Sequence, residues 1–350
     1  MHASPEHCYK INRVFLKMLG LWPYQQSNFT RIHKALFAGL LLSFILVQVK
    51  NMLERMRDDW RLLKDKIEID IIEKYANEIK FSSIVSILIG FFFVFFLAII
   101  QFLPLLLDVI LPLNESRPFR IIVIAEYFIN QEKYIYIILL HEALAVFIAF
   151  TTLYSTLTTI VIYIWHACAL FKIASHRIEN IIEKNAFMIP IFGRQYVYYQ
   201  KIIYAVLIHR RAVEFAGLIS SNFTILFAIL IIVGVSSLSI NLFQVTLINN
   251  NTEDMCIIVL LISLHLSYMF IINYAGQKVT DHGVELFKAI YNGLWYTAPL
   301  HTQKLLLFIM QKGNVNITLI FGGLYIVSLQ GFASLTNAAV SYFMVMYTRK

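Results

Sequence analysis

A polar stripe near the C-terminal end is the most specific chemical pattern in the sequence. Its six members are Gln330, Ser334, Asn337, Ser341, Val345 and Thr348. They follow one another at intervals of four, three, four, four and three residues, so we expect them on one face of a helix. The other faces carry Leu, Phe, Ala, Val and Met. A polar stripe on an apolar helix must face protein or water, because lipid cannot satisfy it.

Two interpretations of this stripe remain open. In the first, Ser and Asn side chains hydrogen-bond to neighbouring helices, as is common in membrane bundles. In the second, several copies of the helix surround an axis and the stripe lines a water-filled pore. The length of the stripe favours the pore. Val345 interrupts it near the end, as a hydrophobic constriction that gates by dewetting would.

Polar and aromatic residues in two other apolar stretches suggest a cavity for a small ligand. His141 and Glu142 form an ionisable pair inside an apolar run, which indicates either a functional position or partial solvation near a helix end. We predict that the cavity faces outward between helices and is lined by Tyr136, Leu140, His141, Leu144, His265 and Tyr268. An apolar cavity rich in aromatic residues suits small volatile organic molecules. Ordinary helix packing is the alternative for each residue taken singly.

The sequence offers no pattern for catalysis or for a cofactor. It contains no HExxH, GxSxG, Walker or GxGxxG motif, and nothing pairs a nucleophile with a base. Cys8, Cys168 and Cys256 are too widely separated to suggest a metal or redox site. We therefore expect no enzyme activity, no cofactor and no bound metal.

The elements that position these residues must be membrane-spanning helices. Hydrophobic residues make up 59% of the 350-residue chain and charged residues only 14%, whereas a soluble domain is about one quarter charged. Long continuous apolar runs also argue against a β-barrel, whose strands alternate. The sequence predicts an all-α, polytopic transmembrane bundle, with spans at 81–107, 134–165, 215–248, 256–274 and 317–347 and a shorter apolar segment at 35–49.

The basic residues predict the orientation of the chain. Lys and Arg number seven in 166–212 and four in 275–314, whereas 249–255 has none. Because cytoplasmic loops are rich in Lys and Arg, we expect 166–212 and 275–314 inside and the C-terminus outside the cell. The net charge of +8 then reflects basic cytoplasmic loops rather than nucleic-acid binding.

The segment at 35–49 conflicts with this orientation. Residues 1–34 hold five basic residues against Glu6 alone, and 51–80 is also expected inside. Both flanks therefore favour the same side of the membrane. Either the short segment does not cross, or a second span that should follow it is absent.

Three cytoplasmic segments carry structure of their own. The apolar residues of 51–80 recur every three or four positions, which predicts an amphipathic helix leading into the next span, with a solvated connector as the alternative. We expect 166–212 to extend the flanking spans as long helices with a break near Pro190, and 275–314 to hold further helix. Their aromatic and aliphatic residues predict a compact inner domain that contacts other subunits.

The chain resembles an insect odorant receptor of the ant and bee type. The resemblance rests on MLGLWPY at 18–24, AEYFINQEKY at 125–134, HACALFKIASHRIEN at 166–180, LWYTAPLHTQKLLLFIMQK at 294–312 and the C-terminal SLQGFASLTNAAVSYFMVMYTRK. Together these segments span nearly the whole chain in the order of the family. The resemblance therefore implies a single odorant-receptor-like membrane domain over 1–350.

Several expectations follow from the resemblance. Such receptors have seven helices and an inner N-terminus, and they are ligand-gated, non-selective cation channels in the plasma membrane of olfactory sensory neurons. They form hetero-tetramers with a shared co-receptor subunit, bind odorants in the outer half of the bundle and line the pore with the last helix, here 317–348. Val345 matches the gate. The segments 51–80, 166–212 and 275–314 match the anchor, where Trp295 and Gln303 are expected at subunit contacts.

The sequence departs from the family near its start. It is shorter than usual, and the missing stretch lies between Val49 and Asn51, where the family has an outer loop and its second span. A truncated or non-functional receptor is therefore one alternative. A receptor coupled to a G protein is another, but its Asp/Glu-Arg-Tyr and Asn-Pro-x-x-Tyr signatures are absent. A transporter would show internal repeats or broken helices, and the sequence shows neither.

Overall fold

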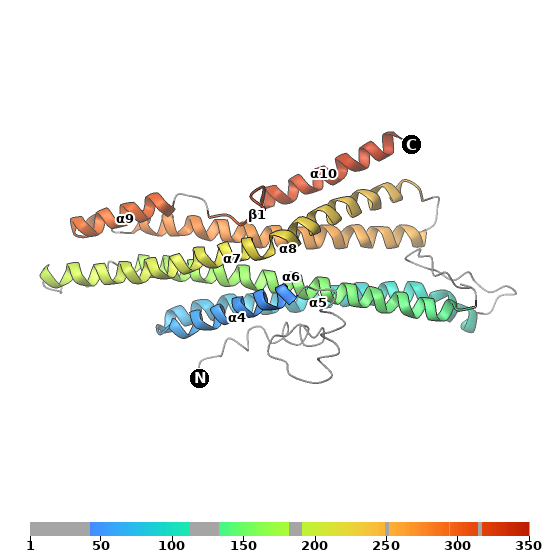
Figure 1. The fold of residues 1–350 in the computed structure, drawn as a ribbon, viewed down its shortest axis with the longest axis horizontal. Coiled ribbons are helices and arrows are strands. Elements are labelled where there is room, and N and C mark those ends of the chain that lie inside the picture. Colours follow the sequence, from blue (N-terminus) through green and yellow to red (C-terminus); the bar gives the residue numbers. More distant parts are fainter. Residues whose placement is uncertain are drawn as a thin grey trace. The chain divides into compact units, whose positions relative to one another are not determined.

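The fold is helical almost throughout. The computed structural model describes residues 43–111, 133–181, 191–248, 252–293, 295–313 and 317–349 (Figure 1). The helices are α4 (Ser43–Leu62), α5 (Lys66–Ile110), α6 (Ile135–Glu179), α7 (Ile191–Val245), α8 (Thr252–Asn292), the 3-10 helix η2 (Trp295–Thr297), α9 (Leu300–Gly313) and α10 (Leu329–Thr348). Strands β1 (Ile320–Phe321) and β2 (Tyr325–Ile326) form a short antiparallel hairpin.

The described residues belong to two compact units. The larger unit contains Phe44–Ile79 and Thr159–Lys350, and the smaller unit contains Lys80–Thr158. The division falls within α5 and α6, so each of these helices contributes one part to each unit.

Four of the described helices can cross a bilayer by their length and composition. They cover Lys66–Pro104, Ile135–Glu179, Tyr196–Val245 and Asp254–Asn292. These ranges confirm the predicted spans at 81–107, 134–165, 215–248 and 256–274 as helices of sufficient length. Large apolar side chains remain exposed on them, including Leu88, Phe92, Ile225 and Ile232, as expected of surfaces that face lipid hydrocarbon.

Within the larger unit, α6 is the central helix. From Ile160 to Ala174 nearly every side chain is buried, so the helix has partners on all sides. The Tyr163 hydroxyl donates to the Val49 carbonyl of α4 at 3.2 Å. The Tyr163 ring also meets Phe215 of α7 edge-on, with ring centroids 6.2 Å apart.

The predicted helix over 51–80 is wrong as a single element. The structure divides it into α4 and the start of α5, with a break at Leu63–Asp65. Asp65 starts the second helix, because its Oδ1 accepts a hydrogen bond from the Ile67 amide at 3.2 Å and its carbonyl accepts from the Ile69 amide at 3.0 Å. At Val49–Asn51, where the resemblance places a missing span, α4 runs on without interruption. Most of the segment at 35–49 lies outside the described residues.

The predicted helix over 317–348 begins later than expected. Its first twelve residues contain the hairpin, and the helix starts only at Leu329. Gly322 and Gly323 turn the chain with φ of +63° and +71°, a region that favours glycine. Ser328 has an extended backbone and its hydroxyl accepts from the Gly331 amide at 3.0 Å, so it caps α10. With 20 residues α10 is long enough to cross the hydrocarbon core of a bilayer. Its polar residues make it less apolar than the four candidate spans named above, and it is not one of them.

The C-terminal elements of the larger unit pack on α7 and α8. Helix α10 contacts both of these helices, β1 contacts α7, and α9 packs on α8 (Figure 1). The site residues predicted on α8 and α10 therefore lie on neighbouring helices of one unit.

Candidate functional site

One face of α10 is attached to the rest of the larger unit. Ala339 is fully buried in an apolar cluster with Val235 and Leu238 of α7, and Leu335 and Ala338 pack at its edge. The Ser239 hydroxyl donates to the Ala339 carbonyl at 2.9 Å. This contact fixes which side of α10 faces α7, because a buried small residue allows the two backbones to approach closely.

The predicted polar stripe lies on the opposite face of α10. All six residues, Gln330, Ser334, Asn337, Ser341, Val345 and Thr348, are exposed. Ser334 and Ser341 donate to the carbonyls of Gln330 and Asn337 at 3.0 and 2.9 Å, so their hydroxyls bond to their own helix. Within the described part of the chain, no hydrogen bond joins a stripe side chain to another helix. The stripe is therefore open to water or to other subunits, and its assignment to a pore stays a prediction.

The ligand residues predicted on α6 belong to the smaller unit. Tyr136, Leu140 and Leu144 are 63%, 57% and 53% exposed, and His141 is exposed as well. Glu142, the residue after His141, is buried, and the Gln101 amide of α5 donates to the Glu142 carboxylate at 2.8 Å. Sequence reasoning missed Gln101. Its signal is an amide inside the apolar run of α5, where a polar group needs a partner.

The two ligand residues predicted on α8 belong to the larger unit. Tyr268 is buried, and its ring lies 5.7 Å from that of His265. The His265 Nδ1 lies 2.7 Å from the Leu261 carbonyl, within hydrogen-bonding distance. The Tyr268 hydroxyl occupies the place where a side chain at Gly234 of α7 would stand, only 2.1 Å from an added Cβ. Gly234 is a second residue that sequence reasoning missed.

The six predicted ligand residues thus fall into two groups, four on α6 and two on α8. The structure places the members of each group close together along one helix. A shared cavity built from both groups remains a prediction.

A buried carboxylate links three helices in the C-terminal half of α6. Asp59 of α4 is 4% exposed and lies 3.1 Å from His166 Nε2 of α6. Arg211 of α7 donates to the other carboxylate oxygen at 2.7 Å. A buried charge is tolerated only when it is paired, so this cluster fixes α4, α6 and α7 to one another.

Two further ion pairs follow along α6 toward its C-terminal end. Arg177 donates two hydrogen bonds to the Glu68 carboxylate of α5, at 2.6 and 2.8 Å, in the forked geometry that suits guanidinium and carboxylate. Lys172 pairs with Glu285 of α8 at 3.3 Å, and Glu285 lies 3.1 Å from His282. Three of the basic residues that predicted a cytoplasmic loop, Lys172, Arg177 and Arg211, therefore join helices of the larger unit.

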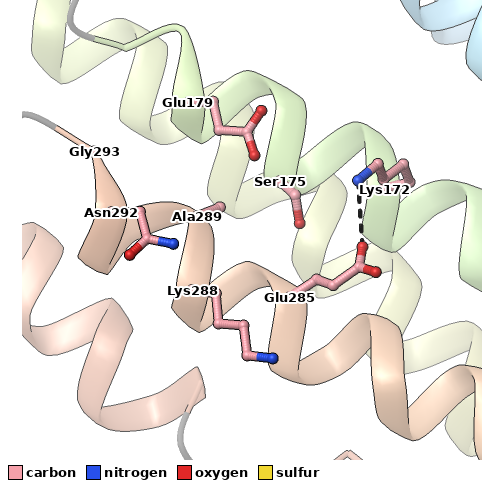
Figure 2. Close-up of a pocket in the computed structure, with 8 residues that line it drawn as sticks. All are labelled: Lys172, Ser175, Glu179, Glu285, Lys288, Ala289, Asn292 and Gly293. Carbon is pink, nitrogen blue, oxygen red and sulfur yellow. Dashed lines mark hydrogen bonds and ion pairs between the residues drawn. The ribbon is translucent and has the colours of Figure 1, made fainter.

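A pocket of about 380 Å³ lies beside the pair of Lys172 and Glu285, between α6 and α8. Figure 2 shows the ion pair with Ser175 and Glu179 of α6 and Lys288 and Asn292 of α8 around the space. Two lysines and two glutamates offset each other, so the pocket favours neither anions nor cations. Among the described residues, no three His, Cys, Asp or Glu side chains gather as a metal site requires.

The residues predicted for subunit contacts lie around η2. The Gln303 amide donates to the carbonyls of Tyr296 and Ala298 at 2.8 and 2.9 Å, which closes the turn that precedes α9. The rings of Trp295 and Tyr296 meet edge-on. Large apolar side chains stay exposed nearby, namely Tyr291, Tyr296, Leu300, Leu307 and Phe308. A surface of this kind suits a protein partner.

The chain is similar to known proteins in both family and fold. The model of a family described as 7tm Odorant receptor matches residues 31–340. The insect olfactory receptor OR5 from Machilis hrabei, solved in complex with eugenol, has the same fold, with a TM-score of 0.75, 15% identity and 99% of each chain covered. A second structure of OR5 gives a TM-score of 0.70 at 14% identity, covering 99% of this chain and 98% of that one. A search of curated proteins found no match. Because the family model covers well over half of its length, this multi-pass membrane protein belongs to the odorant receptor family.

Proposed function

We propose that the chain is the ligand-specific subunit of an odorant-gated, non-selective cation channel. The observation that carries the proposal is the exposed polar face of α10, which lies opposite the buried Ala339. Lipid hydrocarbon cannot form hydrogen bonds with the polar side chains of this face. Water in a pore can form them.

The composition of this face suits a pore with little selectivity among cations. It offers hydroxyl and amide groups from Ser334, Asn337 and Ser341 and no ionised side chain. Val345 is 51% exposed on the same face and supplies an apolar ring when several copies surround an axis. Such a ring closes a pore by excluding water.

One α10 cannot enclose a pore, so the function requires further subunits. We propose a hetero-tetramer with a co-receptor subunit, in which the exposed apolar residues around Trp295 and Gln303 contact a neighbour. The segments 51–80, 166–212 and 275–314 then form the cytoplasmic anchor, and the C-terminus lies outside the cell. The plasma membrane of olfactory sensory neurons is the proposed location.

The proposed ligand is a small volatile organic molecule. OR5 of Machilis hrabei was solved with eugenol, which supports a ligand of this size and chemistry. We propose that Tyr136, Leu140, His141, Leu144, His265 and Tyr268 line the site. Their rings and aliphatic groups offer dispersion contacts, while His265 and Tyr268 add polar atoms that orient a ligand.

Co-expression with a co-receptor tests the proposal. In oocytes, application of a panel of odorants that includes eugenol should evoke a cation current. A background with Cys8 and Cys256 replaced by Ser then receives Ser334→Cys or Ser341→Cys on the exposed face, with Ala339→Cys on the buried face as control. A charged thiol reagent should block the two stripe variants, because water reaches their side chains, and should spare the control.

Two results would overturn the proposal. A chain that reaches the surface with the co-receptor, yet gives no current with any odorant, is not a functional receptor subunit and fits the truncated or non-functional form. Equal block of the stripe and Ala339 variants would show that the stripe does not line the conducting path.

A further inference from the structure

The start of α10 is tied to α8 by one buried amide. Asn273 of α8 is 3% exposed. Its Oδ1 accepts hydrogen bonds from the Tyr325 hydroxyl at 2.6 Å and from the Ser328 amide at 3.2 Å. Its Nδ2 donates to the Met269 carbonyl at 2.8 Å. Every polar atom of the Asn273 side chain therefore has a partner.

The two groups that donate to Asn273 Oδ1 both belong to the segment that leads into α10. Tyr325 belongs to β2 of the hairpin, and Ser328 is the residue that caps α10. Burying an amide is unfavourable unless it is hydrogen-bonded, so an apolar residue would serve better here if packing were the only need.

Neighbouring contacts strengthen the attachment from two sides. One turn along α8, Gln277 Oε1 accepts from the Leu329 amide at 3.4 Å. The backbone of Gly276 lies so close to Val327 that a Cβ added to Gly276 would stand 2.4 Å from the Val327 carbonyl oxygen. On the other side, Phe321 stacks on Phe227 of α7, with ring centroids 3.8 Å apart.

The outer part of α10 has no comparable attachment among the residues that the structure describes. Beyond Ala339, the side chains of Tyr342, Met344, Val345 and Tyr347 are 62%, 51%, 51% and 52% exposed. The hydroxyls of Ser341 and Thr348 bond to their own helix. Helix α10 is thus held at its start by α8 and at Ala339 by α7, and α8 sets where the start of the helix is placed.

Helix α8 also carries two of the proposed ligand residues. His265 and Tyr268 precede Asn273 by eight and five residues, so they lie about 12 and 8 Å from it along the axis of the same helix. We propose that Asn273 is a positioning residue that couples α8 to the pore helix through Tyr325 and Ser328. The proposal rests on the function proposed above. A rotation or shift of α8 on ligand binding is then transmitted to the start of α10 through a contiguous element.

Asn273→Leu and Tyr325→Phe test the coupling. Asn273→Leu keeps the number and branching of the side-chain heavy atoms and removes the acceptor, whereas Tyr325→Phe removes a single hydroxyl. Each should raise the odorant concentration for half-maximal current by about threefold to tenfold, as expected for one or two lost hydrogen bonds. Maximal current per surface receptor and reversal potential should not change, because the pore face is intact. Ser267→Ala on an exposed position of α8 is the matched control.

A double-mutant cycle separates direct coupling from general weakening. Because the two groups bond to each other, the Asn273→Leu and Tyr325→Phe double variant should respond like Asn273→Leu alone. If Asn273→Leu fails to reach the surface, Tyr325→Phe alone decides the question. Two results would overturn the positioning role. One is a half-maximal odorant concentration in the surface-expressed variants that equals the wild-type value. The other is an equal loss of maximal current in the variants without any shift in that concentration. Absence of current in wild type and in Ser267→Ala would instead refute the proposed channel function.

Discussion

The part of α6 from Thr159 onward and the whole of α10 belong to the larger unit, but their polar side chains bond to different partners. On α6, His166, Lys172 and Arg177 contact carboxylates of three other helices. On α10, Ser334 and Ser341 bond to their own backbone, and the stripe faces away from α7. Polar residues of the first kind hold the unit together, whereas those of the second remain available to water.

The largest effect expected from this difference is at Asp59. Asp59→Ala leaves His166 buried without its carboxylate and should lower the free energy of unfolding by about 3–5 kcal/mol. The melting temperature of the purified full-length chain in detergent, followed by fluorescence-detected size exclusion, measures the change. Arg210→Ala is the control, because its ion pair with Glu214 is exposed and contributes about 0.5 kcal/mol or less. Equal melting temperatures for both variants would refute a stabilising role for the buried cluster.

An intermediate effect is expected where α8 meets the chain before α10. Gly276→Ala forces a Cβ against the backbone of Val327 and should lower the free energy of unfolding by about 1–3 kcal/mol. Gly217→Ala on α7 is its matched control, since nothing lies within 4 Å of the added Cβ. The control should stabilise the helix by up to about 1 kcal/mol. The same melting assay distinguishes them, and a Gly276 variant as stable as the Gly217 variant would contradict the close approach.

The smallest effect is expected on the exposed face of α10. Asn337→Ala should change the free energy of unfolding by no more than about 0.5 kcal/mol, because the side chain is exposed and has no partner on another described helix. Ala339→Leu, two residues along, should lower it by about 1–3 kcal/mol by overpacking the contact with α7. A loss of stability from Asn337→Ala that matches the loss from Ala339→Leu would show that the polar stripe is packed rather than open.

The long helices could be predicted from the sequence because an apolar run of bilayer length satisfies its own backbone only as a helix. The break at Leu63–Asp65 could not be found in this way, since the apolar spacing of 51–80 continues across it. The first turn of the second helix does not follow this spacing. Ile67, four residues after Leu63, is 52% exposed, whereas Ile72, Ala76 and Ile79 are buried.

The hairpin at 320–326 was missed for a related reason. Ile, Phe, Leu and Val are more frequent in 317–328 than in the helix that follows, so composition alone indicates one span. Gly322-Gly323 and Ser328 carry the local signal for a turn and a helix cap. That the stripe residues share one face of the helix could be predicted, because helical periodicity needs only sequence spacing, whereas their role in a pore stays a prediction.

The partners of the charged residues on α6 could not be predicted from the sequence. Loop charge predicts the side of the membrane, but it does not say that Arg177 meets Glu68 or that Lys172 meets Glu285. Gln101, Gly234 and Asn273 are single polar or small residues within apolar helices, and each becomes informative only when its neighbour is known.

The ion pairs of α6 also determine when this protein can finish folding during its synthesis. Asp59 and Glu68 precede His166 and Arg177 by 107 and 109 residues, whereas Glu285 follows Lys172 by 113. When α6 leaves the ribosome, two of its basic residues already have partners, and Lys172 must wait until α8 has been made. Contacts this distant in sequence form slowly. A nascent chain that stops before Glu285 therefore exposes an incompletely neutralised helix to the quality-control machinery of the cell.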